Sequence, residues 1–253
     1  MTSPPIPSWP RPHLQPGGYD AQLFYKAQGD LDPTLLRVSR SKHRFDGLPE
    51  GVQLEAHQRS NAPDVLAMGT EHPVMRTALD ALGPKVRSSV LAAPDCMVLR
   101  GHVAQPQTLD YLRNAVGIIQ ALFEAGAHAI YDPFCLTWWS APQWEERFFA
   151  PNAAVPTHHV VILESAENTG DTTWIHTRGM LKFGRPDLSI RGVPTGLRSL
   201  VIDLCNRFIT LQALGGVVPD GQTIRVAGLP KWTCTTQGGL DDPEFNNFHL
   251  SIG

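Results

Sequence analysis

The stretch that decides the fold is HHVVILESAENTGDTTWIHTR, residues 158–178. Residues 158–164 and 172–178 at its two ends are rich in β-branched and aromatic side chains, as strands usually are. The residues between them, SAENTGD, are polar and contain a glycine, which is typical of a loop. The stretch therefore predicts a β-hairpin, two antiparallel strands joined by a loop.

A long amphipathic helix is predicted downstream of this hairpin. Apolar residues recur there at helical spacing, and Gly215-Gly216 ends the pattern; the stripe consists of Leu197, Leu200, Val201, Leu204, Phe208 and Leu211. Three further runs read as closing strands after the turn Pro219-Asp-Gly-Gln222, at residues 223–226, 232–235 and 245–252.

A second long helix is predicted upstream of the hairpin. Its apolar stripe begins at Leu109 and ends near Phe123, Thr108 can cap its first turn, and Gly126 suits the position after its last. Strand-like runs at residues 96–103 and 127–131 flank it. Strands in runs, with only two long helices between them, predict an α+β fold with a mixed, mostly antiparallel sheet and both helices packed on one face.

The N-terminal part is less regular. Residues 1–19 contain Pro4, Pro5, Pro7, Pro10, Pro12 and Pro16, and prolines at this density favour extended chain with few backbone donors. We expect a flexible proline-rich head over residues 1–19 and a single α+β domain over residues 20–253. Within that domain residues 96–253 form the core, whereas residues 20–95 are poorly defined, with strands expected at 35–38 and 52–57 and a helix at 73–82.

Composition excludes several classes of protein. With 42% hydrophobic and 18% charged residues the chain has enough apolar surface to fold, and a net charge of -3 gives no positive field for nucleic acid. No apolar run approaches the roughly 20 residues of a membrane helix, and residues 1–16 lack the pattern of a secretory signal. We therefore expect a cytoplasmic protein that binds neither nucleic acid nor membrane, with its four widely spaced cysteines as free thiols.

The densest polar cluster follows the second hairpin strand. It consists of His176, Arg178, Lys182, Arg185 and Asp187, with glycines at 179 and 184. Strand alternation places Trp174, His176 and Arg178 on one face. Cations beside glycine-opened backbone suit a carboxylate or phosphate. The structural alternative is an ion pair of Arg178 or Arg185 with Asp187 that pins the crossover, and structural ion pairs are common.

Other motifs offer little chemistry. His158, His159 and His249 show no zinc-type spacing, so no metal site is predicted. The chain lacks Gly-x-Ser-x-Gly, the phosphate-binding Gly-x-x-x-x-Gly-Lys and the dinucleotide Gly-x-Gly-x-x-Gly. No cofactor is therefore predicted, although the absence of a motif does not exclude an enzyme.

An aromatic group precedes the hairpin. Trp138 and Trp139 are followed by Ser140-Ala-Pro-Gln143, a capping-box pattern that begins a short helix carrying Trp144. Adjacent tryptophans on a regular strand face opposite sides, so one of them can remain at the surface as an anchor for a protein partner. Burial of both between the helix and a loop is the alternative.

Two function hypotheses follow. The first is a non-enzymatic binding or accessory protein that uses Trp138, Trp139 and Trp144 against a protein partner or as a homodimer. The second is an enzyme or small-ligand binder for an anionic substrate, in which Lys182, Arg185, Asp187 and Trp174 bind while His176 and Arg178 are catalytic. Histidine suits proton transfer near neutral pH.

One segment carries a resemblance. Thr177-Arg-Gly179, then Phe183-Gly-Arg-Pro-Asp187, a long helix and Asp220-Gly-Gln-Thr-Ile224 together resemble a bacterial family described as domain of unknown function 4261. The resemblance covers about residues 158–240, and Asp187 stands where the family pattern often has glutamate. It implies an intracellular bacterial α+β domain and transfers no catalytic residue.

Overall fold

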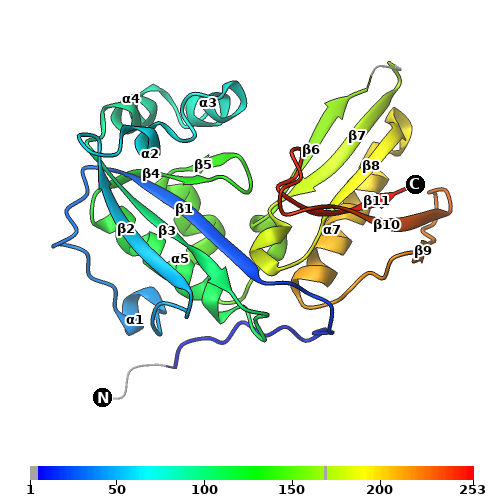
Figure 1. The fold of residues 1–253 in the computed structure, drawn as a ribbon, viewed down its shortest axis with the longest axis horizontal. Helices are drawn as coiled ribbons and strands as arrows, with labels where there is room; N and C mark the ends of the chain where they lie inside the picture. Colours follow the sequence, from blue (N-terminus) through cyan, green and yellow to red (C-terminus); the bar gives the residue numbers. More distant parts are fainter. Residues whose placement is uncertain (1–4, 168–169) are drawn as a thin grey trace. The chain divides into compact units, whose positions relative to one another are not determined.

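The computed structural model describes residues 5–167 and 170–253, and these form two compact units (Figure 1). Unit 1 consists of Met1–Pro10 and Gln22–Ala154, and unit 2 of Arg11–Ala21 and Val155–Gly253. Residues 1–4 of the predicted head and residues 168–169 of the predicted hairpin loop lie outside the described residues. The unit boundaries do not coincide with the predicted ones at residues 19/20 and 95/96.

Unit 1 is built on a five-stranded sheet in the order β2-β3-β1-β4-β5. The strands are β1 (Ala21–Gly29), β2 (Val52–Gln58), β3 (Asp95–Val103), β4 (Ala127–Asp132) and β5 (Thr137–Trp139). The pairs β2/β3, β1/β4 and β4/β5 are antiparallel. Alternating side chains of these strands give the sheet two apolar faces.

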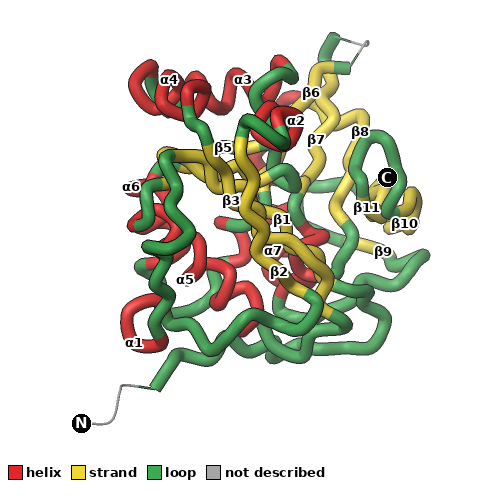
Figure 2. Tube along the Cα trace, turned by 60° about the vertical axis from the view of Figure 1, so that its left-hand side comes forward, coloured by secondary structure: helices red, strands yellow, loops and turns green. Residues whose placement is uncertain are grey.

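Helices supply the apolar partners of this sheet. They are α1 (Arg40–His43), α2 (Pro63–Ala67), α3 (Pro73–Asp80), α4 (Pro84–Ala92), α5 (Asp110–Glu124) and α6 (Ala141–Trp144), which continues as a π-helical turn, Glu145–Phe149. Leu79 of α3 and Val90 of α4 pack against Ala129, Tyr131 and Trp138. The long helix α5 runs alongside the strands in Figure 2 and contacts β4.

A buried lysine occupies the middle of this sheet. Lys26 of β1 has no exposed surface, and its ammonium donates to the carbonyl oxygens of Val65, Leu66 and Met68 at 3.3, 2.8 and 2.5 Å. It also lies 5.2 Å from the centre of the Trp138 ring, as a cation–π contact requires. Lys26 therefore binds the carboxyl end of α2 to the sheet, and its burial lowers its pKa to about 7.

Unit 2 contains a six-stranded mixed sheet in the order β6-β7-β8-β11-β10-β9. The strands are β6 (Val161–Ala166), β7 (Thr172–Arg178), β8 (Asp187–Pro194), β9 (Thr223–Ile224), β10 (Trp232–Gly239) and β11 (Asn247–Ile252). Within the described part of this sheet, β8/β11 is the only parallel pair, and β6/β7 is the hairpin predicted from residues 158–178.

The helix α7 (Arg198–Ala213) covers one face of this sheet. Its buried residues Val201, Leu204 and Cys205 pack against the apolar side chains that β7, β8 and β11 direct to that face; these include Ile175, Leu188, Ile190, Leu250 and Ile252. Three short 3-10 turns complete unit 2, at Pro156–His158, Met180–Phe183 and Thr195–Leu197.

Residues 11–21 of the proline-rich segment are hydrogen-bonded to the rest of unit 2. The amides of His13 and Gln15 donate to the carbonyls of Leu214 and Gly215, both at 3.0 Å, and the Tyr19 amide donates to Gly184 at 3.2 Å. We call residues 11–21 the strap. The strap therefore packs as part of unit 2 and not as a detached head.

The predicted class, α+β, is confirmed, but the packing of both long helices on one face is not. Helix α5 belongs to unit 1 and α7 to unit 2, so each of the two sheets has one long helix. The strand predicted at residues 35–38 is wrong, since that segment is a turn and coil. No residue range was predicted for β8, and Asp187 at its start was interpreted as part of a polar cluster on a crossover.

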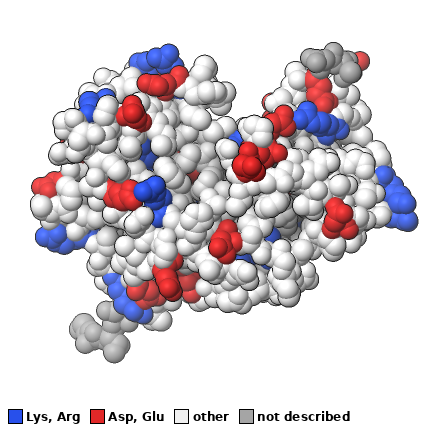
Figure 3. All heavy atoms as spheres, in the orientation of Figure 1, with Lys and Arg blue, Asp and Glu red and all other residues white. Residues whose placement is uncertain are grey.

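Charged side chains of both signs are mixed on the surface, and the cysteine thiols are buried. Figure 3 shows lysines, arginines and carboxylates interspersed over the face it presents. All four cysteines are free and buried. Within the described part of the chain, every helix is too short or too polar to cross a bilayer.

Burial of Lys26 predicts a pH dependence of the stability of unit 1. The unfolded chain, with its lysine pKa near 10.5, binds a proton that the folded state has lost above about pH 7. The free energy of unfolding should therefore rise between pH 7 and 9.5, by at most about 1.4 kcal/mol per pH unit. Lys26→Met should lack this rise.

The measurement is urea unfolding at both pH values, followed through amide NMR signals of Leu99 and Ile130 in unit 1. Equal pH dependence in the parent and in Lys26→Met would show that the lysine keeps its proton on folding.

Candidate functional site

The predicted histidine of the β7 face is packed between aromatic rings. His176 is 7% exposed, its ring stacks on Trp174 with centroids 3.9 Å apart, and Phe245 meets it edge-on at 5.8 Å. Burial, with the nearby charges of Arg178 and Arg191, lowers the pKa of His176 to about 4. The imidazole is therefore neutral at physiological pH.

Arg178 has a structural role. It donates to the carbonyl oxygen of Glu244 and, at 3.2 Å, to that of Phe245. These bonds join β7 to the turn that precedes β11. A catalytic or anion-binding role would require the guanidinium to exchange these partners for a ligand.

Arg185 is also bound to main chain. It is 3% exposed, and its nitrogens donate to the carbonyl oxygens of Gly216, Gly184 and Gly215 at 3.1, 3.2 and 2.8 Å, and to that of Gln15 at 3.4 Å. The guanidinium therefore joins the strap to the chain that follows α7. Carbonyl dipoles therefore solvate its charge. The sequence had instead predicted contact with an anionic ligand or an ion pair with Asp187.

Asp187 is the centre of a buried hydrogen-bond network. Its carboxylate accepts from the Thr177 hydroxyl at 2.9 Å, from the Met180 amide at 3.2 Å and from the Asn247 side-chain amide at 2.7 Å. Burial raises the pKa of Asp187 to about 6, although these donors act in the opposite direction. Asp187 is thus a positioning residue with no direct access to solvent.

The network continues to the phenol of the strap. The Tyr19 hydroxyl donates to Asn247 Oδ1 at 2.5 Å, while Asn247 Nδ2 donates to Asp187 and, at 3.1 Å, to the Arg185 carbonyl. A carbonyl oxygen only accepts, which fixes the orientation of the Asn247 amide. Burial is the main reason that the pKa of Tyr19 is raised far above its usual value, so the phenol stays protonated.

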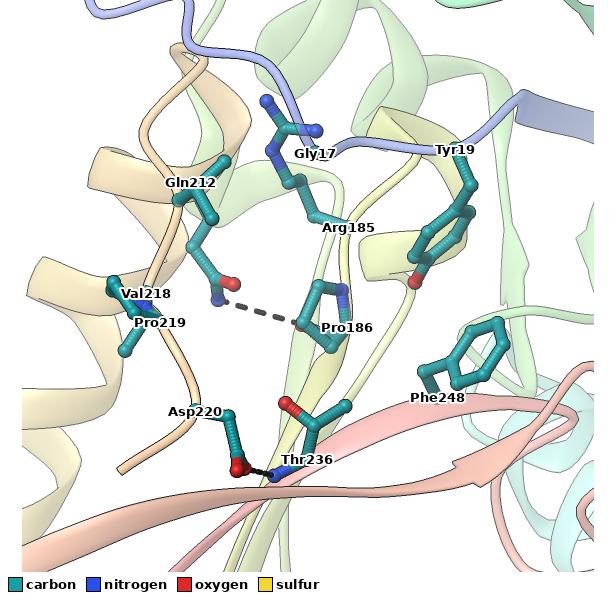
Figure 4. Close-up of a pocket in the computed structure, with 11 residues that line it drawn as sticks. Gly17, Tyr19, Arg185, Pro186, Gln212, Val218, Pro219, Asp220, Thr236 and Phe248 are labelled. Atoms are coloured by element: carbon teal, nitrogen blue, oxygen red, sulfur yellow. Dashed lines mark hydrogen bonds between the residues drawn. The ribbon is translucent and has the colours of Figure 1, made fainter. Parts of the chain in front are cut away.

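A cavity of about 300 Å³ lies against this network (Figure 4). The wall of the cavity is formed by the strap, helix α7, the loop after α7 and strands β10 and β11. The lining residues are Gly17, Tyr19, Arg185, Pro186, Gln212, Val217, Val218, Pro219, Asp220, Thr236 and Phe248. The rings of Tyr19 and Phe248 lie 5.4 Å apart. Such a cavity, mostly apolar with a few polar groups, is typical of a small-molecule site.

Gln212 gives this cavity its unusual polar group. The side chain has no exposed surface, its Nε2 donates to the Pro186 carbonyl at 3.4 Å, and its Oε1 has no hydrogen-bond partner in the described structure. A buried acceptor without a donor costs about 1–3 kcal/mol. Buried polar groups without partners are rare in folded proteins.

Close packing of glycines keeps the strap against the cavity wall. A Cβ atom at Gly18 would lie 1.6 Å from Nη1 of Arg185, and one at Gly184, whose φ is +62°, would lie 2.1 Å from the Tyr19 carbonyl oxygen. Any larger side chain at residue 18 would displace the guanidinium. The two glycines therefore permit the contact between Arg185 and the strap.

The predicted partner-binding tryptophans lie in the core of unit 1. Trp138, Trp139 and Trp144 are 1%, 8% and 0% exposed. The indole nitrogens of Trp138 and Trp144 donate to the carbonyls of Gly69 and Val116. Of the two alternatives, one tryptophan at the surface or both buried, the structure shows the second, because both faces of β5 are covered.

The structure separates most of the predicted cluster from the cavity. Arg185 lines it and Asp187 stands behind it, whereas Trp174, through its indole nitrogen, donates to Ser189, and Lys182 is fully buried in the turn before Gly184. Sequence reasoning missed Tyr19 and Gln212. The available signal for Gln212 was a polar residue at a core position of an otherwise apolar helix stripe.

No metal or known relative helps to interpret this site. In the described ranges, no group of three or more His, Cys, Asp or Glu side chains is placed to hold a metal ion. Comparisons with protein-family models, curated proteins and solved structures find no match. The resemblance to domain of unknown function 4261 therefore stays a prediction.

Burial of Asp187 predicts a second pH dependence, of opposite sign to that of Lys26. Because the folded pKa of about 6 exceeds the unfolded value of 3.8, the stability from this group is present below pH 3.8 and is lost as pH rises through 6. The loss is about 1.4 kcal/mol for each pKa unit of difference. In Asp187→Asn the free energy of unfolding should differ from that of the parent protein, but it should not show this fall as pH rises.

Urea unfolding at pH 4.5 and 7.5, followed through amide signals of Leu188 and Leu250 in unit 2, measures the difference. The raised pKa predicts that the difference in free energy of unfolding between the parent protein and Asp187→Asn changes from pH 4.5 to pH 7.5. An equal difference at the two pH values would contradict it.

Proposed function

We propose that unit 2 is a small-molecule-binding module whose ligand occupies the cavity between the strap, α7 and β10. The observation that carries the proposal is the fully buried side chain of Gln212, a residue that lines this cavity and whose carbonyl oxygen has no hydrogen-bond partner among the described residues. A donor on a ligand would satisfy that oxygen and recover the cost of leaving it unpaired.

The form of the cavity supports the same function. Its volume of about 300 Å³ is at the lower end of the range for small-molecule sites, which suits a compound of about one ring. Apolar walls and an aromatic pair, Tyr19 and Phe248, offer contact area. Figure 4 shows the amide of Gln212 on one side of Pro186 and the Tyr19 phenol on the other.

The other two functions expected from the sequence have weaker support. A protein partner or homodimer held by Trp138, Trp139 and Trp144 would need exposed tryptophans, and these are buried. Catalysis on an anion by His176 and Arg178 would need a guanidinium that is released from Glu244 and Phe245. Both stay predictions.

A substitution that fills the cavity tests the proposal. Thr236 of β10 lines the cavity, and Gln237 beside it points to the opposite face of the strand. Thr236→Trp should abolish binding of ring compounds, while Gln237→Trp, the matched control, should leave it unchanged. Tryptophan is well tolerated on strands, so both variants should fold.

Binding is measured by backbone amide NMR shifts with a set of phenylethyl compounds that carry an amine, hydroxyl, ether or carboxylate group. We expect saturable shifts at Gly17, Val217 and Thr236 in the parent protein and in Gln237→Trp. The proposal fails if none of these compounds gives saturable shifts there, or if Thr236→Trp binds as well as the parent.

A further inference from the structure

The polar side chains that line the cavity restrict the chemistry of its ligand. Resting on the proposed function, we infer that the ligand is a ring compound whose head group donates hydrogen bonds, namely an amine, and that carboxylates and phosphates are rejected. Three side chains carry this inference: Gln212, Tyr19 and Asp220. Each of them presents an acceptor, as their existing hydrogen bonds show.

The amide of Gln212 presents its oxygen. Its Nε2 is directed to the carbonyl oxygen of Pro186, which can only accept, so the amide orientation is fixed by its partner. Oε1 is then the end without a partner. A ligand at this position must bring a donor.

The phenol of Tyr19 presents lone pairs and not its proton. That proton is used on Asn247 Oδ1 at 2.5 Å. Asn247 cannot turn its amide to release it, because Nδ2 already donates to Asp187 and to the Arg185 carbonyl. The buried carboxylate of Asp187 thereby acts on the ligand indirectly, by keeping Tyr19 an acceptor toward the cavity.

The carboxylate of Asp220 is the third acceptor. Its Oδ1 accepts from the Thr236 amide at 2.8 Å, which positions the group at the exposed rim of the cavity. A carboxylate offers acceptor sites alone and attracts a positive head group. The Thr236 hydroxyl can either donate or accept, so it opposes neither kind of ligand.

Arg185 is the lining residue that would otherwise favour an anion. Its nitrogens donate to the carbonyl oxygens of Gly184, Gly215, Gly216 and Gln15. These bonds use four of the five N–H groups of the guanidinium, so an anion in the cavity would compete with main-chain carbonyls for Arg185 and would face the oxygens of Gln212, Tyr19 and Asp220. A donating head group would instead match the acceptor of Gln212, Tyr19 or Asp220, and the rings of Tyr19 and Phe248 are available to an ammonium, as in cation–π sites.

Matched phenylethyl compounds test the inference. The probes are 2-phenylethylamine, the methyl ether of 2-phenylethanol, which only accepts, and phenylacetate, which is anionic. Dissociation constants come from amide shifts of Gly17, Val217 and Thr236. We expect the amine to bind roughly tenfold or more tightly than the ether, as one or two hydrogen bonds of a charged donor would give. Phenylacetate should bind more weakly than the ether.

Two variants identify the acceptors. Gln212→Met keeps the side-chain length and removes the oxygen, so the preference for the amine over the ether should fall several-fold; Gln237→Met on the exposed face of β10 is the matched control. Asp220→Asn keeps the oxygen that accepts from Thr236 and removes the charge. It should weaken the amine and leave the ether unchanged, with Asp241→Asn as its control, and both aspartates are exposed, so folding is preserved.

The outcomes separate the inference from the proposed function. If phenylacetate or the ether binds in the cavity as tightly as the amine, the inference of a donating head group is overturned and the proposed binding function stands. Amine preference that survives both Gln212→Met and Asp220→Asn also overturns it. Absence of cavity shifts with every probe overturns the inference and the proposed function together.

Discussion

The architecture of unit 2 depends on two arginines at the carboxyl end of α7. A helix ends with unpaired carbonyl oxygens and the negative end of its dipole, and α7 has no basic residue in its own last turn. Arg11 of the strap donates to the Ala213 carbonyl at 3.1 Å, and Arg185 donates to those of Gly215 and Gly216. Arg11 thus satisfies the last carbonyl of α7 and Arg185 those of the two glycines that follow the helix, and together they hold the strap against this end of α7.

The cavity is a consequence of that clamp. Arg185 donates to the Gln15 carbonyl, and the absence of a side chain at Gly18 leaves room for the guanidinium beside the strap. The strap is thereby positioned so that the Tyr19 phenol donates to Asn247. The buried network from Tyr19 to Asp187 then decides which atoms face the cavity. The polar residues that the sequence suggested as catalytic support the fold instead, and we infer that Gln212, Tyr19 and Asp220 present acceptors to the cavity.

The sequence predicted the elements better than their contacts. Periodicity identified α5 and α7, since each has an apolar stripe, and composition identified the β6–β7 hairpin, but neither signal could show that α5 and α7 cover different sheets. The sequence placed Arg185 and Asp187 in one polar cluster but did not reveal their partners. Main-chain carbonyls bind Arg185, whereas Thr177, Met180 and Asn247 bind Asp187. Tyr19 could not be predicted as a site residue because it reaches the cavity through the fold of the strap.

Hydrogen exchange of the strap in an Arg185→Lys variant tests the central claim most directly. Lysine keeps the charge but lacks the planar fork that reaches several carbonyls at once. The clamp predicts that the amides of His13, Gln15 and Tyr19 lose protection by tenfold or more, while Leu188 and Leu250 in the sheet keep theirs. Unchanged protection of the three strap amides would contradict a strap held by Arg185.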